Sequence, residues 1–225
     1  MQQKTLLFTT SYSKDIDGLL KRPIKWMKFH CNVGLNFDKL LIVDDGSPEI
    51  PNSDDFSILN LDCENEINSK ICFVSHKPHL GRNETNTLDY PGWYRSFSYA
   101  GKYAKRFGYN KIIHIESDAY LMSKKIINHF NELNYGWHSM WCGRHNFPET
   151  AIQIICEDNL DKFFRIISLP YNLFKGHAIE TLLPFSNVEK SFMGDRYGEY
   201  LDIPPEGCDY ACQWRNDWAA PILEG

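Results

Sequence analysis

The stretch Lys39-Leu40-Leu41-Ile42-Val43-Asp44-Asp45-Gly46-Ser47-Pro48 decides the fold of this chain. Its apolar first half predicts a strand that is buried on both faces, as strands of parallel sheets are. Asp-Gly and Ser-Pro are strong turn formers, so the chain is expected to turn directly after Val43. The turn would aim a carboxylate of Asp44 or Asp45 outward from the end of the strand.

Similar short runs lie on both sides of this strand and alternate with helical patterns. They predict strands over residues 5–10, 71–74 and 111–115. Helices are predicted over residues 15–29, kinked or divided at Pro23, and from Pro91 to about Phe107. This alternation predicts an α/β fold with a mainly parallel, Rossmann-like sheet flanked by helices. After residue 125, helical patterns cover residues 123–133 and 160–167, and the rest is irregular.

Composition limits the partners that we expect. The net charge of -5 argues against a broad nucleic-acid interface, which requires a basic surface. No stretch approaches the apolar length of a membrane span. The predicted helix over residues 15–29 has a basic side, which fits a solvated face or a helix in peripheral contact with a membrane; it contains Lys21, Arg22, Lys25 and Lys28. Seven cysteines without a regular framework, and no signal peptide, predict a cytoplasmic protein with reduced thiols.

A second acidic motif, Glu116-Ser117-Asp118, follows the predicted strand over residues 111–115. Carboxylates at positions i and i+2 of a strand point the same way, so both can address one divalent cation. The alternative is an ordinary helix cap. Ligands of open parallel sheets bind outside the carboxyl ends of the strands, which is where both acidic motifs are expected. There, Asp44 or Asp45 could accept from a ribose hydroxyl or a pyrimidine N–H.

These motifs resemble those of the family 2 glycosyltransferases and their GT-A relatives. Residues 41–49 resemble the "VDDGS" segment, and residues 115–119 stand where the family has its "DxD" metal motif. Gly81-Arg82-Asn83 and Arg95 resemble the stretch that precedes the family's central helix. The resemblance implies that residues 1–125 are a nucleotide-sugar-binding half and residues 126–225 an acceptor-binding half of one domain.

The resemblance also implies roles for individual residues. It predicts contacts with the base at the end of the first strand, by Thr9, Thr10, Ser11 and Tyr12, and a uracil or ribose contact by Asp44 or Asp45. Asp118 would ligate Mn²⁺ or Mg²⁺. Glu116 stands where the family has Asp, so it would reach the ribose or, through water, the metal. Basic residues expected near the diphosphate, with a solvated face as the alternative, are Arg82, Arg95 and Lys102.

The second half should supply the general base of an inverting transferase, whereas a retaining enzyme would need none. Glu180 is the first candidate, because it lies in the segment that begins at Gly176 and among apolar neighbours that could raise its pKa. Other acids compete for this role, namely Glu149, Glu157 and Asp158. His177 is a candidate third metal ligand or phosphate contact, with a structural role as the alternative.

The expected function is metal-dependent transfer of a sugar from UDP or a similar nucleotide diphosphate to a hydroxyl of a glycan or lipid-linked glycan. One alternative is a sugar-phosphate nucleotidyltransferase. That class would favour a glycine-rich loop after the first strand, but no glycine occurs there before Gly18. The other alternative is a non-catalytic nucleotide-sugar-binding module on the same fold.

Overall fold

The computed structural model describes residues 3–83, 88–219 and 221. Its main feature is an eight-stranded mixed sheet with strand order β3-β4-β2-β1-β5-β8-β7-β9. The strands are β1 (Thr5–Ser11), β2 (Lys39–Asp44), β3 (Ser57–Ile58), β4 (Ile71–Ser75), β5 (Lys111–Ile115), β7 (Trp137–Cys142), β8 (Phe147–Cys156) and β9 (Asn187–Glu189). All neighbouring pairs are parallel except those of β8, which runs antiparallel to both β5 and β7.

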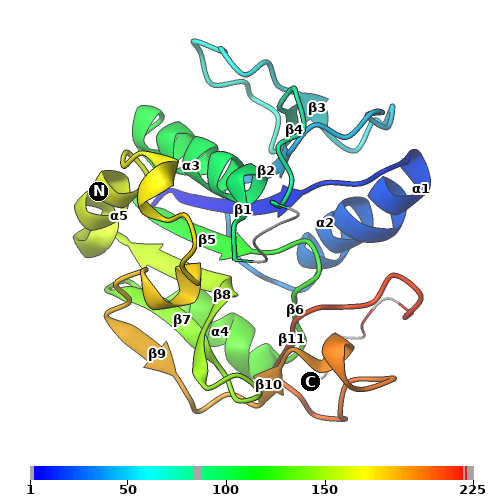
Figure 1. Cartoon of the computed structure of the whole chain (residues 1–225), viewed down its shortest axis with the longest axis vertical. Helices are drawn as coiled ribbons and strands as arrows, with labels where there is room; N and C mark the ends of the chain where they lie inside the picture. Colours follow the sequence, from blue (N-terminus) through cyan, green and yellow to red (C-terminus); the bar gives the residue numbers. More distant parts are fainter. Residues whose placement is uncertain (1–2, 84–87, 220, 222–225) are drawn as a thin grey trace.

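A second, small sheet and the helices complete the fold (Figure 1). The small sheet has the order β10-β11-β6. Its strands are β10 (Gly194–Asp195), β11 (Tyr210–Ala211) and β6 (Tyr120–Leu121). The helices are α1 (Ile16–Leu19), the π-helical η1 (Leu20–Ile24), α2 (Lys25–His30), α3 (Pro91–Arg106), α4 (Lys124–Glu132), α5 (Leu160–Ile166) and the 3₁₀ turns η2 (Glu157–Asn159), η3 (Tyr171–Leu173), η4 (Ile179–Thr181) and η5 (Tyr197–Glu199).

The large sheet is the middle layer of three, because its strands bury side chains on both faces. On β1, Leu7 packs into one hydrophobic core, and Leu6 and Phe8 pack into the other. The same alternation holds along β2 and β5. Helices α2 and α4 contribute to the first core, and helices α3 and α5 contribute to the second.

The predicted α/β fold with a mostly parallel sheet is confirmed. The four predicted strands become β1, β2, β4 and β5, and each agrees with its prediction to within a residue. Pro23 lies inside the π-helical turn that divides the predicted helix over residues 15–29 into α1 and α2. Residues 137–156 add two long strands that the sequence pattern does not indicate.

The turn after β2 depends on Asp44 and Gly46. The buried carboxylate of Asp44 accepts hydrogen bonds from the backbone N–H of Gly46 and Ser47, at 3.0 and 2.7 Å. It also accepts from the hydroxyls of Ser47 and Ser75, at 2.6 and 2.7 Å. Gly46 has φ +94°, and a Cβ there would lie 2.8 Å from the carbonyl oxygen of His76. Only glycine fits this turn without strain.

His30 makes the fold sensitive to acid. Its ring is fully buried, its Nδ1 lies 3.0 Å from the carbonyl oxygen of Trp26, and its Nε2 has no partner among the described residues. Burial lowers the pKa of His30 from 6.5 to about 3. Below pH 6.5 the unfolded chain therefore takes up a proton that the folded chain excludes. His30 should cost about 2 kcal/mol of stability between pH 7 and pH 5.

Urea unfolding at a series of pH values tests this contribution of His30. The substitution His30→Phe keeps a ring at this site but removes the titrating group. As the pH falls from 7 to 5, the unfolding free energy of the wild type should decrease by about 2 kcal/mol more than that of the variant. Parallel pH profiles for the two proteins would contradict the prediction.

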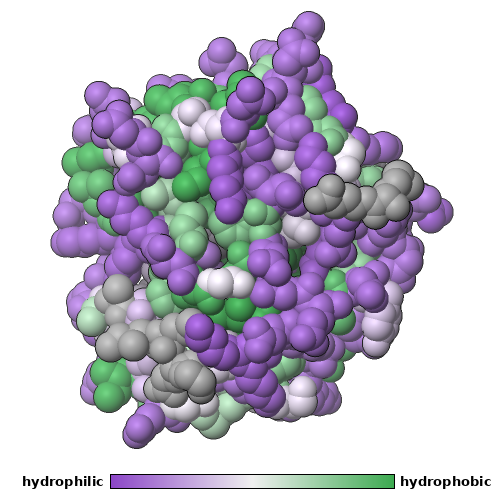
Figure 2. Space-filling model, turned by 180° about the vertical axis from the view of Figure 1, so that it is seen from behind, coloured by the Kyte–Doolittle hydropathy of each residue, from purple (hydrophilic) through white to green (hydrophobic). Residues whose placement is uncertain are grey.

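No helix in the described part of the chain is long and apolar enough to cross a membrane. Figure 2 shows the face opposite that of Figure 1, where hydrophilic side chains surround a smaller central area of hydrophobic ones. The basic side chains of the first helical region do not form one uninterrupted surface. Lys21 pairs with Asp17 and Lys28 with Asp55, whereas Arg22 turns inward to Asp118.

Candidate functional site

A cleft of about 700 Å³ lies at the carboxyl ends of β1 and β5. This volume is typical of pockets that bind small molecules. Residues from both halves of the chain line it. The predicted site residues among them are Thr10, Ser11, Tyr12, Asp45, Arg82, Glu116, Asp118, Glu149, His177 and Glu180. The topology thus brings together side chains that are up to 170 positions apart in the sequence.

Asp118 is held in the cleft by Arg22. The guanidinium Nη2 of Arg22 lies 2.7 Å from Oδ2 of Asp118. Arg22 comes from the π-helical turn that contains Pro23, and such turns are frequent at functional sites. Burial raises the pKa of Asp118, and Arg22 opposes this effect. The pair places one carboxylate and one guanidinium side by side at the wall of the cleft.

Glu116 is more fully bound to the protein than Asp118 is. Its Oε2 accepts from the hydroxyl of Thr10 at 2.6 Å, and its Oε1 accepts from the indole N–H of Trp93. Oε1 also lies 3.2 Å from Nε2 of the buried His114. Burial alone would raise the pKa of Glu116, but these three neighbours together lower it. Glu116 therefore ties β1, α3 and β5 together beneath the cleft.

Asp45 joins the turn after β2 to the N-terminus of α3. Its carboxylate accepts from the backbone N–H of Leu80 and Gly81, at 3.2 and 2.8 Å, and pairs with Arg95. A Cβ at Gly92 would collide with this carboxylate, so a glycine is required where α3 begins. The positive end of the helix dipole then faces the cleft beside Asp45.

Aromatic rings form part of the cleft wall near Asp45. The rings of Tyr12 and His79 stack with centroids 3.6 Å apart and an angle of 15° between their planes. Nδ1 of His79 lies 2.9 Å from the carboxylate of Asp45, which orients this ring. Tyr90 and Trp93 line the same cleft. Flat aromatic surfaces of this kind suit stacking by a base or contact with a sugar ring.

On the opposite side, Arg196 hydrogen-bonds to two carboxylates and lies 3.8 Å from a third, that of Glu199. Its Nε and Nη2 bind the buried Glu149 in a bidentate pair, at 2.6 and 3.0 Å. Nη2 also lies 3.1 Å from Oε1 of Glu180, the same oxygen that accepts from Thr150 at 3.5 Å. Burial raises the pKa of Glu149, while Arg196 opposes this effect. Glu149 thus fixes Arg196, and Arg196 fixes Glu180.

The structure does not place every predicted site residue at the cleft. Thr9 is fully buried in β1. The carboxylate of Asp44 is also buried, and it accepts hydrogen bonds within the turn described above. Arg95 pairs with Asp45 but does not line the cleft, and Lys102 is exposed further along α3. The competing acids Glu157 and Asp158 lie in η2, outside the cleft lining, and Asp158 accepts from the backbone N–H of Gly136.

Several cleft residues were not among the predicted site residues, and the sequence offers little signal for them. The sequence pattern predicts Arg22 on a basic helix face, whereas in the structure it lies in the π-helical turn and pairs with Asp118. Trp93 belongs to the apolar stripe of α3, yet its indole N–H reaches Glu116. Arg196 has no motif around it, and its partner Glu149 is 47 positions away.

The described residues contain one group of three side chains whose ligand atoms all lie within 4.8 Å of one another and could hold a metal ion, His129, His138 and Glu189. Glu116, Asp118 and His177 do not form such a group, although all three line the cleft. No protein-family model and no curated protein matches the chain.

Proposed function

We propose that this chain is a glycosyltransferase that binds a nucleotide-diphosphate sugar in the cleft and transfers the sugar to a hydroxyl acceptor. One observation carries the proposal. The ends of β1, β2 and β5 bring Tyr12, Asp45 and Asp118 to one cleft, and Glu180 from the second half lines the same cleft. Crevices at the carboxyl ends of parallel strands are the usual ligand sites of α/β sheets.

The donor nucleotide would occupy the side of the cleft formed by β1, β2 and the start of α3. Tyr12 and His79 offer a flat surface for the base, and Asp45 holds the loop that carries His79. Arg82 lines the cleft on this side, and the N-terminus of α3 favours a negatively charged ligand. This arrangement supports a nucleoside diphosphate as the donor, with UDP as the first candidate.

Asp118 fits a role as ligand of Mn²⁺ or Mg²⁺ on the diphosphate. Such cations commonly take one or two protein carboxylates and complete their shells with phosphate oxygens and water. When bound, the cation would neutralise the diphosphate and stabilise it as a leaving group. Glu116 fits direct ligation less well, because its two oxygens already accept from Thr10 and Trp93. We assign it to positioning the strand end.

The acceptor would approach from the side of Arg196. Within the described residues, the hydrogen bonds of Glu180 to Thr150 and Arg196 both use its Oε1. Its Oε2 can therefore take the proton of the acceptor hydroxyl as the hydroxyl oxygen attacks the sugar carbon. The bond from this carbon to the diphosphate breaks in the same step. The rings of His145 and Phe147 stack at 5.3 Å at the same end of the cleft and suit a sugar acceptor.

Thermal-shift screening of nucleotide sugars and nucleoside diphosphates, with and without Mn²⁺, tests the proposal. One nucleoside diphosphate should raise the melting temperature, and this rise should require the metal. Release of the same nucleoside diphosphate in the presence of a hydroxyl acceptor would identify transfer. If no nucleotide stabilises the protein under either condition, the proposal is wrong.

Arg82 and Lys102 provide a matched pair for the position of the diphosphate. Arg82 lines the cleft, whereas Lys102 is exposed outside it. The substitution Arg82→Ala should weaken nucleoside diphosphate binding about tenfold, since a charge-assisted contact with phosphate is lost. The substitution Lys102→Ala should leave the affinity unchanged. Calorimetric titration measures both, and equal losses would show that only the overall charge matters.

A further inference from the structure

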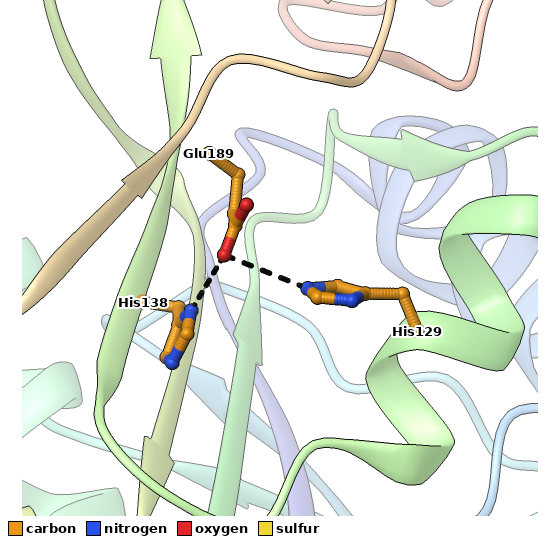
Figure 3. A group of neighbouring side chains, drawn as sticks. All are labelled: His129, His138 and Glu189. Carbon is orange, nitrogen blue, oxygen red and sulfur yellow. Dashed lines mark hydrogen bonds and ion pairs between the residues drawn. The ribbon is translucent and has the colours of Figure 1, made fainter.

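Three side chains of types that can ligate a metal lie together away from the cleft (Figure 3). His129 comes from α4, His138 from β7 and Glu189 from the edge strand β9. None of them lines the cleft described above. His138 is buried, with 3% of its side chain exposed, whereas His129 and Glu189 expose 30% and 22%. The group is therefore closed by protein on one side and open to solvent on the other.

The carboxylate of Glu189 faces both imidazole rings. Its Oε1 lies 2.8 Å from Nδ1 of His138 and 3.6 Å from Nε2 of His129. Ligands of a tetrahedral Zn²⁺ ion, each 2.0–2.2 Å from the metal, are roughly 3.3 Å from one another. The two separations from Glu189 lie on either side of this value, and all three ligand atoms lie within 4.8 Å of one another.

His138 is oriented as a metal ligand would be. Its Nε2 lies 2.9 Å from the carbonyl oxygen of Tyr135, a fixed backbone acceptor to which it can donate its proton. In that tautomer Nδ1 directs a lone pair at the carboxylate of Glu189, 2.8 Å away, so that either a proton on Nδ1 or a metal ion between the two atoms joins them. Asn187 also approaches Nε2, with its side-chain nitrogen 3.1 Å away. Gly136 leaves room for this arrangement, since a Cβ there would lie 2.5 Å from Nε2. Metal-bound histidines usually donate their second N–H in this way.

His129 contributes a second nitrogen. Its Nε2 is buried and has no hydrogen-bond partner within the described part of the chain. The nitrogen nevertheless lies on the side that faces Glu189, as Figure 3 shows. A buried ring nitrogen without a hydrogen bond is costly, and coordination to a metal would satisfy it.

We propose that His129, His138 and Glu189 bind one Zn²⁺ ion, with water as the fourth ligand. Two imidazoles and one carboxylate are a ligand set that zinc takes in proteins. The absence of these residues from the cleft lining favours a structural ion over a catalytic one. The ion would fasten β9, which pairs with β7 over residues 187–189 alone, to β7 and α4. It would thereby stabilise the segment that leads on to Arg196.

Titration of chelator-treated protein with ZnCl₂ tests the site. We expect one ion per chain and a rise in melting temperature that depends on zinc concentration. The substitutions His129→Gln and Glu189→Gln should each weaken binding at least about tenfold. Glu132→Gln removes an exposed acid from the same helix, and Asp118→Asn removes the acid of the cleft. Both of these control variants should bind zinc as the wild type does.

Two further measurements keep the test decisive. Circular dichroism shows whether the variants are folded, and Glu189→Gln changes the side chain least. The absorption spectrum of the Co²⁺ form should show nitrogen and oxygen ligation without cobalt–thiolate charge-transfer bands. A wild type that binds no zinc, affinity that is unchanged in both ligand variants, or thiolate bands in the cobalt spectrum would each overturn the proposal.

Discussion

The substitution Asp118→Ala should abolish the stabilisation of the protein by a nucleoside diphosphate with Mn²⁺ and lower sugar transfer about a hundredfold or more. Asp118 is the carboxylate whose contacts leave it suited to a cation, because only its Oδ2 pairs with Arg22. Without it, neither the cation nor the diphosphate would be held at the end of β5. Thermal shift, calorimetric titration and a transfer assay measure the loss.

A matched control for Asp118 lies on the first helix. Asp17 pairs with Lys21 in the same way, but its side chain is 66% exposed and lies outside the cleft. Asp17→Ala should therefore bind nucleotide and metal as the wild type does. Folded Asp118→Ala protein that still binds a nucleoside diphosphate in a metal-dependent manner would refute the role proposed for Asp118.

The largest expected effect on stability comes from Arg196→Ala. This change leaves the carboxylate of Glu149, 1% exposed, without its bidentate partner. Removing one member of a buried ion pair costs about 3–5 kcal/mol, or roughly 6–20 °C in melting temperature for a chain of this length. Transfer should also fall, because Glu180 loses the guanidinium that positions it.

The pH dependence of the Arg196→Ala variant follows from Glu149. Burial raises the pKa of this carboxyl even in the presence of Arg196, so the pKa should rise further without it. A raised pKa in the folded state means that stability falls as the pH increases above the ordinary value of 4.5. The decrease in unfolding free energy that Arg196→Ala causes should therefore be large at pH 8 and smaller at pH 5, as measured by urea unfolding.

The double variant Glu149→Gln, Arg196→Met separates the two roles of Arg196. Replacing both partners removes the buried unpaired charge, so most of the lost stability should return. Transfer should remain low, because Glu180 still lacks its guanidinium partner. A double variant as unstable as Arg196→Ala would show that packing, and not charge, causes the loss.

The first half of the fold could be predicted because its patterns are local. Buried runs such as residues 40–43 identify strands, and Pro91 and Gly108 mark the two ends of α3. Strand β8 has no such local pattern. It begins with Phe147-Pro148-Glu149-Thr150, where a proline and two polar residues hide the apolar run that follows. The register of its pairing with β7 also shifts between Ser139 and Met140, and no local sequence pattern predicts this shift.

The cleft was predictable only where strand ends define it. Acids that follow buried strands must lie at one edge of a parallel sheet, and this places Asp45 and Asp118 in the same cleft. The choice between Asp44 and Asp45 depends on the direction of each side chain within one turn. The inward direction of Arg22 and the position of Arg196 depend on tertiary packing between segments that are distant in sequence.

The position of β5 in the sheet has a consequence for dividing the protein. This strand lies between β1 from the first half and β8 from the second, and all five of its residues are buried. A fragment that ends near residue 125 would expose the backbone of Lys111–Ile115 as an unpaired hydrophobic edge, which is a template for aggregation. We therefore expect such a fragment to aggregate, and we expect chimeras that exchange either half to need both β5 and β8.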